Sequence, residues 1–260
     1  MADRPNFVLV PDPDPSGNTP SRPASLLTHL RGLAVSVGSW LSHRTAAIAA
    51  PERAATNWSG RARLVFGFDA TASREPAWAM ARQVTDALVR ALPGELDVAL
   101  AVHGGSRLHT FTDFTADPNM LRDQAAAITC RSGHTQLLPL LSCALARPGV
   151  RVITYIGDVF EESPARGRKL ADELADRGIR LIVLHDTAHW TARRDAELFL
   201  DLARRTGGCV LPFDASAPGR LRELLAAIAV FAVGGAELLE DKRAELPGAA
   251  LLLRRLSDGE

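Results

Sequence analysis

The chain has 260 residues, and its 30 Lys and Arg balance 30 Asp and Glu, so the formal net charge is zero. This balance excludes a protein that binds nucleic acid or an acidic membrane through its overall charge. Hydrophobic residues make up 47% of the sequence, an ordinary globular composition that excludes disorder of the whole chain. Function must therefore depend on the local arrangement of residues.

The first 60 residues carry two different patterns. Residues 1–24 are rich in Pro, Asp and Ser and have few groups to bury, so we expect a disordered tail. Residues 25–60 begin with apolar side chains at helical spacing, which predicts a docking helix followed by a connector. A helix that binds a partner or a membrane surface is the alternative interpretation of the same segment.

From about residue 62 onward, strand-like and helix-like segments alternate, which is typical of an α/β domain. The expected strands are 64–68, 96–102, 107–114, 150–156, 179–184 and 209–213. Helices are expected at 76–92, 117–129, 164–177 and 219–233. Two more are expected, one between Gly133 and Pro148 and one that contains Leu198 and Leu202 and ends at 207–208.

A short turn, residues 103–106, separates the second and third expected strands. Because a parallel crossover needs a dozen or more residues, this pair must be antiparallel. The sequence therefore predicts a three-layer α-β-α, Rossmann-like fold with a mixed sheet of about six strands, mostly parallel with one antiparallel edge strand. We place this domain at residues 61–235 and a C-terminal tail, whose leucines can dock on it, at 236–260.

The three cysteines, Cys130, Cys143 and Cys209, lack the spacing of a zinc site or a disulfide framework. We expect them to be small thiols in a reducing compartment. The N-terminus has no basic start followed by an apolar run, and no window of about 18 apolar residues occurs. These features predict a cytoplasmic protein without a membrane span.

The first strand ends in an Asp-x-Thr-x-Ser run formed by Asp69, Thr71 and Ser73. Ligands of open α/β sheets bind at the carboxyl ends of the strands, where this run is expected. One carboxylate and two hydroxyls are oxygen ligands suited to Mg²⁺ or Mn²⁺. The same residue types are also common in turns and helix caps, so the run alone does not decide between the two interpretations.

Two further loops are expected at the same edge of the sheet. Thr135 lies in a loop that opens a helix, and Asp158 follows the fourth strand. In order and spacing, residues 62–233 resemble the von Willebrand factor A (vWA, or integrin I-like) domain with its metal-ion-dependent adhesion site (MIDAS).

The resemblance implies that Asp69, Thr71, Ser73, Thr135 and Asp158 hold Mg²⁺ or Mn²⁺. Thr71 replaces the commoner Ser but keeps its hydroxyl, and Gly157 and Val159 differ from the residues that many members have beside Asp158. The resemblance further implies a metal-dependent protein–protein interaction module of bacterial cytoplasmic type that binds an Asp or Glu of its partner, within a multiprotein assembly or beside an AAA+ ATPase. No enzymatic activity and no nucleic-acid partner are expected.

Two other interpretations keep the fold. The domain can serve as a metal-independent scaffold, or Asp69 can be the nucleophile of a phosphohydrolase. Such phosphatases carry a run similar to Asp-x-Asp-x-Thr, whereas here Thr71 stands in the place of the second Asp.

Other polar residues are expected near the same edge. Three histidines and one aspartate belong to this group: His134, His185, His189 and Asp186. They form either a second metal site or a rim that contacts the partner, or they are ordinary solvated loop residues. Glu161 and Glu162 can add acidity to this rim, although such pairs are usually only exposed charges. Nothing in the sequence distinguishes His103 and His109.

Overall fold

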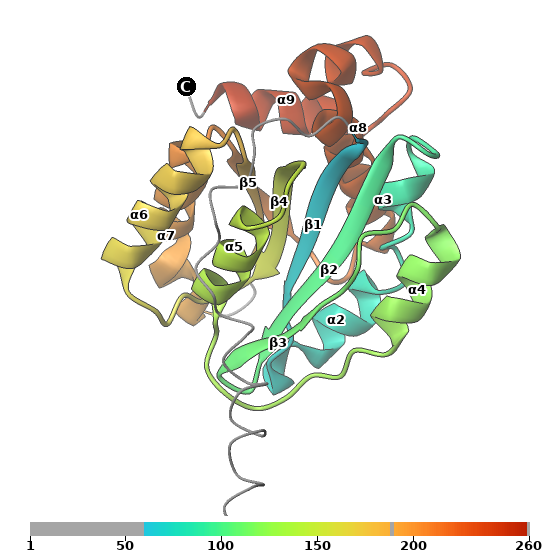
Figure 1. Cartoon of the computed structure of the whole chain (residues 1–260). Helices are drawn as coiled ribbons and strands as arrows, with labels where there is room; N and C mark the ends of the chain where they lie inside the picture. The colour runs from blue at the N-terminus through green and yellow to red at the C-terminus, as the bar shows by residue number, and fades with distance from the viewer. Residues whose placement is uncertain (1–59, 188–189, 259–260) are drawn as a thin grey trace, which may run out of the picture. The chain divides into compact units, whose positions relative to one another are not determined.

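The computed structural model describes residues 60–187 and 190–258. The expected tail (1–24) and almost all of the helix and connector (25–60) lie outside these residues. The described strands form one mixed sheet in the order β3-β2-β1-β4-β5-β6 (Figure 1). Their bounds are β1 (Ala62–Asp69), β2 (Leu96–Gly104), β3 (Arg107–Phe111), β4 (Val150–Gly157), β5 (Arg180–Asp186) and β6 (Cys209–Phe213).

Helices cover both faces of this sheet. One face packs against α2 (Glu75–Ala81), α3 (Ala87–Arg90), α4 (Pro118–Ala126), α8 (Pro218–Asp241) and α9 (Ala249–Ser257). The other face packs against α5 (Leu137–Leu145), α6 (Pro164–Asp176) and α7 (Trp190–Arg205). A short 3₁₀ helix, η2 (Ala72–Arg74), follows β1. The predicted three-layer α/β fold is confirmed.

The pairing of the strands is parallel except at one edge. β1 pairs in parallel with both β2 and β4, and β3 pairs with β2 in antiparallel orientation, as the short turn predicts. In this register Asp69 of β1 lies opposite His103 of β2, and Gly157 of β4 lies opposite His185 of β5. The ends of four neighbouring strands therefore bring polar residues to one edge of the sheet.

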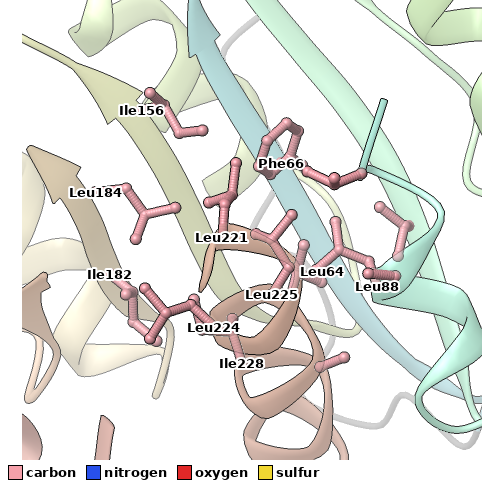
Figure 2. Packing of buried hydrophobic residues seen from close by; sticks show 14 of the residues in the cluster. Leu64, Phe66, Leu88, Ile156, Ile182, Leu184, Leu221, Leu224, Leu225 and Ile228 are labelled. Carbon is pink, nitrogen blue, oxygen red and sulfur yellow. The ribbon is translucent and has the colours of Figure 1, made fainter. Parts of the chain in front are cut away.

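The larger hydrophobic core lies between the sheet and α8. Leu64 and Phe66 of β1 point toward Leu221 and Leu225 of α8, and all four side chains are buried (Figure 2). Each such side chain contributes roughly 1.5–3 kcal/mol when it is removed from water. This packing holds β1 rigid and thereby fixes the position of the residues at its carboxyl end.

The helix expected at 76–92 is interrupted. α2 ends at Ala81, and after Arg82 the N–H groups of Gln83 and Val84 bond carbonyls three residues back rather than four. The hydroxyl of Thr85 also bonds the carbonyl of Arg82 at 3.2 Å, so a side chain competes for a backbone group of this segment. Helical structure resumes only at Ala87.

The segment after Gly235 is helical rather than extended. α8 continues to Asp241 through a bend at Gly235, whose φ of 67° is a conformation that favours glycine. Leu239 at the end of α8 and Leu252 of α9 are buried in the larger core, so the leucines of this segment do dock on the domain. None of the helices within the described residues has the length and apolar character needed to span a membrane.

Candidate metal centre

Asp69, the last residue of β1, is completely buried. Its Oδ1 atom accepts a hydrogen bond of 3.0 Å from the N–H of Thr71 and lies 3.8 Å from Nδ1 of His103. Its Oδ2 atom accepts no hydrogen bond from any described residue, although it is buried. A buried carboxylate oxygen without a partner is costly, so this atom marks a place where a ligand fits.

The environment raises the pKa of Asp69 from 3.8 to about 7. Burial is the largest cause, and the nearby carboxylate of Asp158 adds to it, while the N–H of Thr71 and the guanidinium of Arg74 act in the opposite direction. Asp69 and Asp158 are therefore close enough to repel each other. A divalent cation between them would relieve this repulsion.

The hydroxyls of Thr71 and Ser73 lie on the same turn as Asp69. Thr71 has an extended backbone and precedes η2, and the N–H of Arg74 bonds its carbonyl at 2.9 Å, which closes the turn. The turn brings Oγ1 of Thr71 within 3.3 Å of Oγ of Ser73. Thr71 is buried and Ser73 is exposed, so the pair leads from the buried carboxylate to the surface.

Asp158 directly follows β4 and is also buried. Its Oδ1 accepts a 2.9 Å hydrogen bond from the N–H of Val159, and its backbone carbonyl accepts one of 3.0 Å from Nε2 of the buried His185. The first bond orients the Asp158 carboxylate, and the second holds its backbone. Its other oxygen, Oδ2, lies 3.8 Å from Nη1 of Arg74.

Thr135 is buried in the loop before α5 and is bound to Glu161 in both directions. Its N–H donates to Oε2 of Glu161 at 2.8 Å, and its hydroxyl oxygen accepts the N–H of Glu161 at 3.1 Å. The hydroxyl proton and one lone pair of Thr135 remain for a further ligand. The structure thus places Thr135 beside the loop that follows Asp158.

His103 ties the Thr135 loop to the end of β2, a role that the sequence analysis missed. Its Nδ1 accepts the N–H of Gln136 at 3.2 Å, so Nε2 carries the proton and donates to the Tyr155 hydroxyl at 2.9 Å. Burial lowers the pKa of His103 to about 3, which keeps the ring neutral. The signal available in the sequence was its position at the end of the strand that neighbours β1.

Arg74, immediately after Ser73, was also missed. Its side chain is buried, and its Nη1 atom lies 2.6 Å from Oδ2 of Asp186 at the end of β5. The candidate site residues that the sequence indicates are carboxylates, hydroxyls and histidines, and this cation is not among them. Asp186 therefore belongs to the site as the ion-pair partner of Arg74.

The rim residues make specific contacts. Glu161 and Glu162, which the sequence left as either acidic rim residues or only exposed charges, accept the backbone N–H groups of Thr135 and Leu138 at 2.8 and 2.9 Å. The exposed His134 contacts Glu161 through Nδ1 at 3.1 Å. His189 lies outside the described residues.

No three His, Cys, Asp or Glu side chains of residues 60–187 and 190–258 are grouped to hold a metal ion. A metal at the end of β1 would therefore need hydroxyl ligands in addition to carboxylates. Asp69, Thr71, Ser73 and Asp158 offer such a mixed oxygen set, and the orphaned Oδ2 of Asp69 fits it. Thr135 is the remaining candidate ligand, from a separate loop.

Comparisons with known proteins support the fold. Neither protein-family models nor curated proteins match the sequence. Among solved structures, the chain is similar to a von Willebrand factor type A protein from Catenulispora acidiphila, with 15% identity and a TM-score of 0.54 over 66% of this chain and 43% of that one.

Two further solved structures agree. The pilus adhesin SpaC from Lactobacillus rhamnosus has 10% identity and a TM-score of 0.54 over 66% of this chain and 30% of that one. Proximal thread matrix protein 1 from the mussel byssus, with a zinc-occupied MIDAS motif, has 14% identity and a TM-score of 0.51 over 65% of this chain and 46% of that one. This chain covers less than half of each of the three proteins. The described domain therefore has a vWA-type fold.

Proposed function

We propose that this protein is a metal-ion-dependent protein–protein interaction module. In this proposal Asp69, Thr71, Ser73, Thr135 and Asp158 hold Mg²⁺ or Mn²⁺, and the metal recognises an Asp or Glu of the partner. The observation that carries the proposal is the buried Oδ2 atom of Asp69, which has no hydrogen-bond partner among the described residues. The turn of Asp69 also carries the hydroxyls of Thr71 and Ser73, and the carboxylate of Asp158 is close enough to raise the pKa of Asp69.

The ligand chemistry favours recognition of a carboxylate. Two carboxylates and neutral hydroxyls leave a divalent cation with an open coordination position when the partner is absent. The exposed Ser73 lies at the edge of this site, where an incoming side chain has access. A carboxylate is the side chain that best completes an oxygen ligand set around Mg²⁺ or Mn²⁺.

The same contacts disfavour an enzymatic role. Without a metal, Asp69, with its pKa raised to about 7, is a weak nucleophile at neutral pH because much of it is protonated. Nδ1 of His103 lies 3.8 Å from Oδ1 of Asp69, but both ring nitrogens are engaged and burial lowers the pKa of His103 to about 3. A residue with these properties is a poor general base. The phosphohydrolase interpretation is the weaker one.

The proposed partner is a protein in a multiprotein assembly, and an AAA+ ATPase of the bacterial cytoplasm is the partner that the vWA resemblance suggests. The adhesin and the byssus matrix protein with its zinc-occupied MIDAS support a role in protein assembly and a divalent metal. The zinc in the byssus protein makes Zn²⁺ a third metal to test beside Mg²⁺ and Mn²⁺.

A metal-independent scaffold is the second candidate function, and one observation favours it. The guanidinium of Arg74 lies 3.8 Å from Oδ2 of Asp158 and 2.6 Å from Oδ2 of Asp186, so a cation of the chain itself already faces these carboxylates. In this alternative Arg74 supplies the positive charge and no metal is needed.

Thermal melting with EDTA, Mg²⁺, Mn²⁺ or Zn²⁺ distinguishes the two candidates. A metal that binds only the folded state stabilises it by about 2.7 kcal/mol at a concentration of 100 Kd. We expect Mn²⁺ to raise the Tm of the wild type but not that of Asp69→Ala. Asp123→Ala, which removes an exposed carboxylate of α4, is the matched control and should respond like the wild type. Identical melting curves at millimolar metal would contradict the metal proposal and favour the scaffold.

A further inference from the structure

Arg74 is a buried cation inside the proposed metal centre. The residue is 3% exposed, and its guanidinium contacts two carboxylates from different strand ends, at 2.6 Å from Asp186 and 3.8 Å from Asp158. Its position in the chain, next to Ser73, keeps it beside the candidate ligands.

The contacts of Arg74 are uneven. Nη1 makes the short contact with Asp186, whereas Nε and Nη2 are buried and have no hydrogen-bond partner among the described residues. The ring of Phe213 at the end of β6 lies 5.9 Å from the guanidinium carbon. A guanidinium can bind a carboxylate through two parallel hydrogen bonds, and here only Nη1 bonds a carboxylate. Arg74 therefore keeps unused donors beside Asp158.

With a metal bound, the carboxylate of Asp158 would face two positive charges, the metal and the guanidinium of Arg74. A divalent cation held by Asp69 and Asp158 and the guanidinium of Arg74 would repel each other across a few ångströms of buried, weakly polarisable protein. Asp186 reduces this repulsion because its carboxylate holds the guanidinium of Arg74 at a shorter distance than Asp158 does.

We propose that Arg74 competes with the divalent metal for Asp158 and that Asp186 holds Arg74 away from it. In this arrangement Arg74 lowers the metal affinity of the site, and Asp186 raises it. Arg74 and Asp186 are thus positioning residues that set how much metal the site binds at a given concentration. This inference rests on the proposed metal-dependent function.

The test is Mn²⁺ binding by isothermal titration calorimetry to the full chain at one pH, with folding checked by circular dichroism. We expect Arg74→Gln to bind Mn²⁺ at least tenfold more tightly than the wild type. Asp186→Asn should bind it at least threefold more weakly because Arg74 loses its holding partner. Opposite signs for two residues of one ion pair are not expected from structural damage, which would weaken binding in both variants.

Further variants serve as controls. Arg82→Gln removes the guanidinium of the residue that follows α2 and should bind Mn²⁺ like the wild type. Arg74→Lys keeps the charge and should remain within threefold of the wild type. Arg74→Met, which also removes the charge, replaces Arg74→Gln if that variant does not fold and should likewise bind Mn²⁺ at least tenfold more tightly. Asp69→Ala, alone and combined with Arg74→Gln, should abolish the binding.

The outcomes separate the inference from the proposed function. Equal affinities of Arg74→Gln, Asp186→Asn and the wild type, all abolished by Asp69→Ala, would overturn the role of Arg74 and leave the metal function standing. An Asp186→Asn variant that binds as tightly as the wild type, or more tightly, would also overturn it. Absence of Mn²⁺ binding in both the wild type and Arg74→Gln would overturn the metal function and the inference together.

Discussion

Strand β1 passes through two environments of equal burial and opposite character. Phe66, in its middle, is completely buried among apolar side chains of α8, and Asp69, at its end, is completely buried beside other polar groups. Burial stabilises the fold at Phe66, whereas at Asp69 it raises a pKa and leaves one oxygen without a partner. The comparison shows that one rigid strand both stabilises the domain and holds its site in a state that favours a ligand.

The largest expected effect on stability comes from the apolar part of β1. Phe66→Ala should lower the free energy of unfolding by about 3–5 kcal/mol, because it removes a fully buried ring and leaves a cavity. Urea denaturation with and without Mn²⁺ measures the effect. The loss should be the same in both conditions, and a loss that disappears with Mn²⁺ would contradict the separation between core and site.

Asp69→Asn should raise the free energy of unfolding in metal-free buffer, the opposite of the Phe66→Ala effect. The pKa of Asp69 in the folded state is about 7, well above its ordinary 3.8, so the folded state loses stability as the pH rises from about 4 to about 7. Three pKa units correspond to at most about 4 kcal/mol of unfolding free energy. We expect Asp69→Asn to be more stable than the wild type by about half of this amount at pH 8. Urea denaturation with EDTA between pH 5 and pH 8 measures it. A variant with the same pH dependence as the wild type would contradict the buried position of Asp69.

Metal binding should depend on pH for the same reason. A metal displaces the proton of Asp69, so the apparent Mn²⁺ affinity should rise by up to tenfold per pH unit below about 7 and level off above it. One such step is about 1.4 kcal/mol. Calorimetric titrations at pH 6, 7 and 8 measure the dependence, and an affinity that is flat over this range would show that Asp69 is not a ligand.

The smallest expected effect concerns the polar support of the site. Tyr155→Phe removes the hydroxyl that accepts the Nε2 proton of His103 and should cost about 1 kcal/mol of unfolding free energy. Thermal melting without metal measures this loss. The variant should also bind Mn²⁺ more weakly, because His103 holds the loop that carries Thr135. An unchanged affinity would limit His103 to a role in folding.

The parts of the fold that follow from local patterns were predictable. The apolar runs predicted all six described strands, and the length of the turn at 103–106 predicted the antiparallel edge. The Asp-x-Thr-x-Ser run also predicted that Asp69, Thr71 and Ser73 share one turn, because such a turn involves only neighbouring residues. That these residues bind a metal remains a prediction.

The contacts that escaped prediction join distant residues. Arg74 and Asp186 are 112 positions apart, and no local pattern indicates that an arginine after the Asp-x-Thr-x-Ser run turns inward. His103 meets Tyr155 across 52 positions, and only the strand register places them together. At the break after α2 the Thr85 hydroxyl bonds the carbonyl of Arg82, a contact that apolar spacing does not report.

The two-way bonding of Thr135 and Glu161 has a consequence for association. It clamps the loop before α5 to the loop after β4, so segments that carry two of the candidate ligands, Thr135 and Asp158, are already ordered in the free protein. Ordering a loop at the moment of binding would subtract from the affinity. Here that entropy is lost during folding, and a partner meets a surface whose shape is already set.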